Sequence, residues 1–234
     1  MSADANSSNA VFNQTSHTFF SPVVEILFVV FCVLIAEWIA LPVFGKKYFL
    51  VSAAVPVSAA FIFMFFSHRA RHESLYDLGF RADNFLKSLM LLAPPMLIAT
   101  FFLILIGWWC ESLRIGEIRL SRSLLGTFFG MFIWGLIQQY PLQAFINRRA
   151  QMIWGKEAWL TTLLTAGVFA LLHLPNLWLT LATFGGGILW SRTYQRAPNL
   201  FALALSHSLM TVVLVTTVPY ASLHGMRVGY GYFL

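Results

Sequence analysis

The sequence predicts an all-α protein, a polytopic transmembrane bundle of about seven helices (six to eight) around a buried polar pocket. Two observations predict this class. The 234 residues are 59% hydrophobic and only 10% charged, whereas a soluble domain averages about 25% charged residues. Apolar runs, beginning with the one at 22–44, are about as long as the ~20 residues that span a bilayer.

The first 20 residues are polar and contain no Lys or Arg. A secretory signal peptide would need a basic start and a compact apolar core. We therefore expect 1–20 to be a disordered tail, and the apolar run that follows it to be a retained span. Residues 21–73 then hold the first two spans and their connection.

The remaining elements follow in order along the chain. The polar connection at 68–87 predicts a short interfacial helix and a turn at Gly79. The glycine-rich run at 177–191 is short for a span, which indicates a tilted or re-entrant piece. The tail at 219–234 is expected to be a loop over the pocket mouth or at the interface. Trp190, near a span end, is expected among the interfacial aromatics. The expected spans are 22–44, 49–67, 86–109, 123–145, 159–175, 177–191 and 199–218.

The distribution of Lys and Arg between the two sets of loops favours a cytoplasmic N-terminus. Nine cations lie in the loops on the N-terminal side, and six lie in the opposite loops. The first set is Arg69, Arg71, Arg81, Lys87, Arg148, Arg149, Lys156, Arg192 and Arg196; the second is Lys46, Lys47, Arg114, Arg119, Arg122 and Arg227. The cations form no stripe interleaved with aromatics, so nucleic acid is not expected as a partner.

The stretch LIQQYPLQAFINRR, at 136–149, places amides and a proline where a membrane helix should end. Gln139, Gln143 and Asn147 recur every four residues and would share one helix face, while Gln138 would face a second neighbour. Pro141 should kink the helix because it cannot donate a hydrogen bond and clashes with the preceding turn. The amides could form hydrogen bonds to neighbouring helices, worth roughly 0.6–2 kcal/mol each, or they could line a reaction centre.

Two histidines lie inside apolar segments on different helices, His173 in FALLHLPN and His207 in ALSHSLMT. Phe169 and Thr211 each lie one helical turn from one of them. Zinc normally takes three or four protein ligands, often including thiolate or carboxylate, and the only acid recognised deep in a span is Glu37. We therefore expect no metal and no cofactor. A histidine base and amide or hydroxyl donors are instead typical of hydrolysis.

FALLHLPN, followed about 30 residues later by ALSHSLMT, resembles the second and third motifs of the CAAX-protease and bacteriocin-processing (CPBP, or Abi) family. SLYDLGFR, at 74–81, resembles the segment before that family's core, so 74–218 is expected to be a CPBP-like membrane core. The resemblance implies a membrane endopeptidase in which His173 helps to activate water and His207 helps to stabilise the oxyanion. The family's first motif, two glutamates and an arginine, falls on Gln138, Gln139 and Gln143.

These glutamines cannot act as a general base, whose loss typically slows a reaction by 10²–10⁴-fold. The resemblance implies catalytic roles for His173, His207 and, through water positioning, Gln138. It implies a pocket lined by Gln139, Gln143, Phe169, Asn176 and Thr211. Glu37 either replaces the missing acid or is a neutral or helix-pairing acid. The alternative functions are a catalytically weakened pseudoprotease that binds or helps to assemble a membrane partner, and a transporter or small-molecule binder. Expected partners are the lipid bilayer and a membrane-associated or lipidated protein substrate or partner helix.

Overall fold

The computed structural model describes residues 20–114 and 122–234, so the predicted disordered tail lies, except for Phe20, outside the described residues. Within the two described ranges all regular structure is helical, which confirms the all-α prediction. The helices are α1 (Pro22–Trp38), α2 (Ala40–Ala70), α3 (Phe85–Trp109), α4 (Arg122–Gln139), the π-helix η2 (Tyr140–Asn147), α5 (Arg148–Trp154), α6 (Trp159–Leu171), α7 (Leu177–Arg196), α8 (Leu200–Thr217), and the short α9 (Tyr220–Leu223), η3 (His224–Met226) and η4 (Gly229–Phe233).

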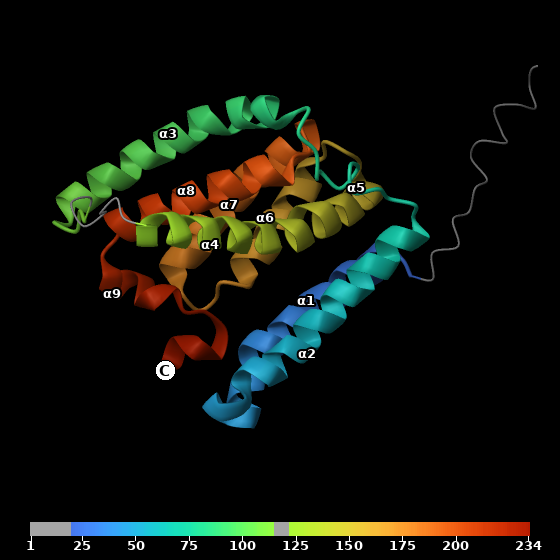
Figure 1. Cartoon of the computed structure of the whole chain (residues 1–234), viewed down its shortest axis with the longest axis horizontal. Coiled ribbons are helices and arrows are strands. Elements are labelled where there is room, and N and C mark those ends of the chain that lie inside the picture. Colours follow the sequence, from blue (N-terminus) through green and yellow to red (C-terminus); the bar gives the residue numbers. More distant parts are fainter. Residues whose placement is uncertain (1–19, 115–121) are drawn as a thin grey trace, which may run out of the picture.

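The long helices form a bundle with an antiparallel pair along its side (Figure 1). Helices α3 and α4 pack against α8, and α6 packs against α7. The pair is α1 and α2, which contact each other along their length. Helix α1 also contacts α5 and η2 on one side and η4 on the other. The pair is therefore attached to the bundle at both ends of α1.

The π-helix η2 lies between the two main apolar cores. Its Phe145 and Ile146 pack with α1, α2 and α6 residues such as Val29 and Met64. Leu142 and Ala144 instead pack with a second core that includes Leu92, Phe169, Trp190, Leu200 and Leu203. This central position fixes the side chains of η2 on both sides.

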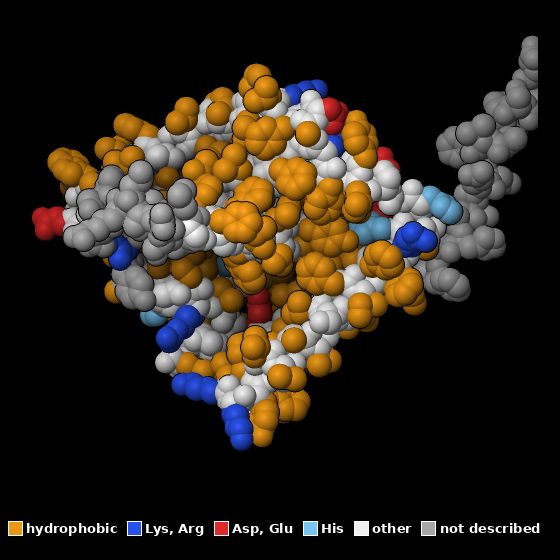
Figure 2. Space-filling view, viewed as in Figure 1, with side chains coloured by type: hydrophobic (Ala, Val, Ile, Leu, Met, Phe, Trp, Pro, Cys, Tyr) orange, Lys and Arg blue, Asp and Glu red, His pale blue; other side chains and the backbone are white. Residues whose placement is uncertain are grey.

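Three described helices, α2, α3 and α8, are long and apolar enough to cross a membrane, and α6 is a shorter apolar helix. Their outward faces carry large apolar side chains, among them Phe101 and Trp109 of α3. Hydrophobic side chains cover most of the described surface in Figure 2. A soluble monomer rarely exposes so large a contiguous apolar patch. The chain is thus an integral membrane protein.

Two expected elements differ from the structure. The interfacial helix predicted between 68 and 87 is wrong: residues 71–84 form turns, because Gly79 at φ 94° lets the backbone pass against the start of α8. A Cβ at Gly79 would lie 3.3 Å from the backbone nitrogens of Asn199 and Leu200. Of the two alternatives for 177–191, the short re-entrant piece is also wrong, because α7 runs for 20 residues without a break. The tilted helix stays a prediction.

The remaining expected boundaries shift by a few residues. Helix α1 ends at Trp38, and α2 begins at Ala40 with a non-helical residue, Gly45, near its start. The expected fourth span continues through η2 and α5 to Trp154. The expected C-terminal loop contains the short turns α9, η3 and η4. The division of the chain at residue 74 stays a prediction.

Candidate functional site

The candidate site begins at the π-helix that joins α4 to α5. Every residue of this segment from Leu142 to Asn147 is buried. Pro141 has no N–H to donate to the carbonyl of Ile137, so a regular α-helical ladder cannot run through it. The departure predicted at Pro141 takes the form of η2, a π-helical segment of the kind often found at functional sites.

Gln139 and Gln143 are both fully buried, but they have different partners. Nε2 of Gln139 donates a hydrogen bond to Nδ1 of His207 over 3.2 Å. Oε1 of Gln143 accepts from Asn147 over 2.8 Å, and Asn147 also donates to the hydroxyl of Ser191. The stripe predicted from α-helical spacing therefore divides: Gln139 bonds to His207, whereas Gln143 and Asn147 belong to an amide network against α7.

His207 is held on α8 by close contacts with two neighbouring helices. Its ring stacks on that of Trp190 with centroids 4.8 Å apart and planes 9° apart, and Trp190 donates to the hydroxyl of Ser206 over 2.6 Å. On the α4 side, a Cβ added to Gly135 would lie 3.1 Å from the Ala204 carbonyl oxygen and 3.5 Å from Cβ of His207. Trp190 was expected at the membrane interface, but it is only 5% exposed because it packs on this histidine.

His173 lies in the turn that follows α6. Its Nδ1 donates to the carbonyl of Phe169 over 2.7 Å. The Phe169 ring meets the His173 ring edge-on at 4.7 Å and lies 6.0 Å from the His207 ring. The structure thus brings His173, His207, Phe169 and Gln139 together from α4, α6, α8 and the turn after α6.

The hydrogen bonds assign different chemistry to the two histidines. A carbonyl only accepts, so Nδ1 of His173 carries the proton and its Nε2 keeps a free lone pair. An amide nitrogen only donates, so Nδ1 of His207 accepts and its Nε2 carries the proton. Both residues remain partly exposed. Their outer nitrogens are therefore one potential base and one potential hydrogen-bond donor.

Within the described residues, Gln138, Thr211 and Asn176 make no hydrogen bond to the ring of either histidine. Gln138 is partly buried, and within the described residues no hydrogen bond joins it to either histidine. The Thr211 hydroxyl donates to the backbone carbonyl of His207 over 2.9 Å. Asn176 caps α7 and donates to the carbonyl oxygens of Leu223 and Arg227 at 2.7 and 3.2 Å. Asn176 therefore anchors the C-terminal segment below the His173 turn.

A buried ionic cluster lies beside η2 and was not predicted from the sequence. Arg149, at 0% exposure, donates to Glu25 of α1 over 2.5 Å and to Glu73 over 3.0 Å. Arg148 and Arg71 bind the same two carboxylates at 2.7 and 3.0 Å. The sequence did contain two signals: a second acid, Glu25, within the first apolar run, and an Arg pair at the end of the 136–149 stretch. Linear sequence does not show that these distant residues meet.

The surroundings of Glu73 determine its charge. Burial alone would raise the pKa of this carboxyl, but hydrogen bonds from His68 and Arg149 and the charges of Arg149 and Arg148 hold the pKa well below its usual range. Glu73 is therefore ionised at neutral pH, and its charge helps to balance the arginines.

Comparison with known proteins adds one match. Residues 120–213 match the family model described as type II CAAX prenyl endopeptidase Rce1-like. No curated protein and no solved structure matches the chain. The matched range contains η2 and both histidines, and it confirms the resemblance stated from the sequence. Over these residues, the chain is similar to the Rce1-like type II CAAX prenyl endopeptidases.

Proposed function

We propose that the protein is an intramembrane endopeptidase that hydrolyses a peptide bond of a lipidated or membrane-associated substrate with water activated by His173. The observation that carries the proposal is the complementary pair of histidine tautomers around Phe169. His173 presents a lone pair and His207 presents an N–H. Peptide hydrolysis needs both a base for water and a donor for the developing oxyanion.

In this proposal, Nε2 of His173 takes a proton from the attacking water as the hydroxide adds to the scissile carbonyl carbon. The carbonyl oxygen becomes an oxyanion, which accepts a hydrogen bond from Nε2–H of His207. The tetrahedral intermediate then collapses, and the protonated His173 gives its proton to the leaving amine nitrogen. The products are a carboxylic acid and an amine, and His173 returns to its starting state.

Gln139 has a supporting role in this proposal. Because its amide nitrogen donates to Nδ1 of His207, it favours the tautomer in which the outer nitrogen of that ring carries the proton. Trp190 holds the same ring in its plane by stacking. Gln138 stays a candidate for positioning the water, with Phe169, Gln143, Asn176 and Thr211 as candidate lining residues.

The experiment is a cleavage assay of the full-length protein in lipid nanodiscs, with a peptide that carries an isoprenylated cysteine near its C-terminus. His173→Ala should lower kcat/KM by about 10²–10⁴-fold, as expected for loss of a general base. His207→Ala should lower it by about 10²–10³-fold, as for loss of one oxyanion donor. His72→Asn is the matched control, because His72 is exposed and Asn tolerates its φ of 53°. Cleavage unchanged in His173→Ala would contradict the proposal.

A second candidate function is a pseudoprotease that binds a membrane helix or lipidated tail in the same place. The side chains that contact the rings of His207 and His173 favour it, because these side chains carry no charge. They are Gln139, Phe169 and Trp190. Gln138→Glu and Gln139→Glu, each combined with Gln143→Arg, probe this alternative. Cleavage that appears only in one of these variants would support the pseudoprotease, whereas native cleavage that depends on His207 would rule it out.

A further inference from the structure

Glu37 differs from every other described acidic residue because one of its carboxyl oxygens is buried without a hydrogen-bond partner. Its Oε2 is inaccessible and has no hydrogen bond within the described part of the chain. Among the other described acids, Glu25 and Glu73 are in ion pairs, Asp77 bonds to Ser74, Asp83 bonds to Arg81, and Glu111 and Glu157 are exposed. An unpaired buried carboxyl oxygen costs stability. An ionisable residue kept in such surroundings is by default a functional one whose partner must be identified.

Gly229 contacts both Glu37 and the turn that carries His173. A Cβ added to Gly229 would lie 2.6 Å from the carbonyl oxygen of Glu37 and 2.8 Å from its Cβ. The backbone nitrogen of Gly229 donates to the carbonyl oxygen of Leu174 over 2.8 Å. Gly229 thus fits between the end of α1 and the residue that follows His173.

The C-terminal segment keeps this arrangement in place. Asn176 holds it through the carbonyl oxygens of Leu223 and Arg227, two residues before Gly229. Figure 2 shows that the apolar surface is hollowed between the α1–α2 pair and the rest of the protein, with an acidic side chain deep in the hollow.

We propose that Glu37 is a positioning residue for the hydrolysis, acting through His173. This inference rests on the proposed function. The Glu37 carboxylate stabilises the imidazolium that forms when His173 takes the proton from the attacking water. The proton then passes from His173 to the leaving amine, so Glu37 ends each cycle unchanged.

The first test is kinetic and uses the full-length protein in nanodiscs with the isoprenylated peptide. Glu37→Gln should lower kcat by about 10²-fold with little change in KM and should shift the acid limb of the kcat–pH profile. Glu37→Asp should recover part of the loss, because it restores the carboxylate. Glu157→Gln, at an exposed position, is the matched control. The melting temperature of Glu37→Gln should be no lower than that of the wild type, because Oε2 of Glu37 makes no hydrogen bond within the described residues that the substitution would break.

The second test measures proximity without relying on catalysis. In a background with Cys32→Ala and Cys110→Ser, the pair Glu37→Cys and His173→Cys is treated with a short bis-reactive thiol reagent, and the linked peptides are identified by mass spectrometry. We expect a cross-link. Phe31→Cys with His173→Cys should give none, because Phe31 is 63% exposed on another part of α1.

The outcomes separate this inference from the proposed function. Wild-type cleavage that is lost in His173→Ala but kept, with an unshifted pH profile, in Glu37→Gln overturns the role of Glu37 and leaves the endopeptidase standing. Absence of the 37–173 cross-link also overturns it. Cleavage that is unaffected by His173→Ala, or absent from the wild type, overturns both.

Discussion

A single side chain, Arg149, joins the α1–α2 pair to the helix that follows η2. Its guanidinium binds Glu25 of α1, Ser67 of α2 and Glu73 of the next connection. It also lies 4.6 Å from the centre of the Phe145 ring in η2. A buried cation with this many partners is expensive to disturb, because removing it leaves carboxylates uncompensated.

Arg149→Met should therefore destabilise the protein by about 3–5 kcal/mol, the range for breaking a buried ion pair. Unfolding in mixed micelles with increasing SDS would measure the change. Lys156→Met is the control, because Lys156 is exposed. Adding Glu25→Gln to Arg149→Met should restore part of the loss, since it removes one unpaired charge. A loss below about 1 kcal/mol for Arg149→Met would mean that Arg148 and Arg71 suffice to neutralise the cluster.

At the scale of elements, α6 and α7 are positioned by the absence of a side chain at Gly187. A Cβ there would lie 2.8 Å from Cα and 3.1 Å from Cβ of Ala166. One turn on from these residues are Trp190 and Phe169, the two rings that contact His207. Close packing at this glycine thus sets the spacing of the aromatic frame of the site.

Gly187→Ala should push α6 and α7 apart, lower stability by about 1–3 kcal/mol as in other overpacked cores, and reduce cleavage by displacing Trp190 and Phe169. Gly185→Ala is an unusually close control, because it lies in the same helix and an added Cβ would meet nothing within 4 Å. Thermal unfolding and the peptide assay, run on both variants, would check this. Equal behaviour of the two variants would contradict the importance of the contact.

The same element explains what the sequence could and could not predict. Apolar runs and the two histidine motifs were enough to predict the bundle and the approach of His173 and His207. The triplet GGG predicted a break in the helix, since glycine weakens a helix. Its last member, Gly187, instead allows α7 to pack closely on α6. The i, i+4 stripe assumed 3.6 residues per turn, and the π-register of η2 gave Gln139 and Gln143 different partners. Glu25 and Arg149 are 124 positions apart in the sequence, and no local sequence pattern predicts a contact between residues so far apart.

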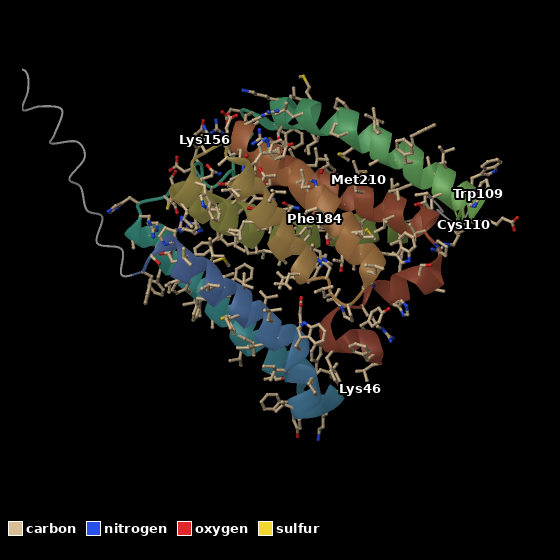
Figure 3. The ribbon with its side chains drawn as sticks, turned by 180° about the vertical axis from the view of Figure 1, so that it is seen from behind. Lys46, Trp109, Cys110, Lys156, Phe184 and Met210 are labelled. Carbon is tan, nitrogen blue, oxygen red and sulfur yellow. The ribbon has the colours of Figure 1, made fainter. Side chains whose placement is uncertain are left out.

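At the scale of the whole molecule, the bundle has two chemically different ends. Lys156 lies at the end near α5, and Cys110 lies at the opposite end with Trp109 (Figure 3). The first end also contains the Arg148–Arg149 pair and the ionic cluster. The larger set of Lys and Arg counted in the sequence includes all of these cations. From the positive-inside rule we predict that the Lys156 end faces the cytoplasm.

The two native cysteines offer a direct test of this orientation. Cys110 is exposed beyond the end of α3, whereas Cys32 is buried in α1. A membrane-impermeant maleimide added to intact cells should label Cys110 from outside, and Cys110→Ser should abolish the label because Cys32 is shielded by packing. Labelling only after the membrane is permeabilised would reverse the orientation. In that case the ionic cluster and the Arg148–Arg149 end would face outward, against the charge distribution, and substrates would have to reach the histidines from the opposite leaflet.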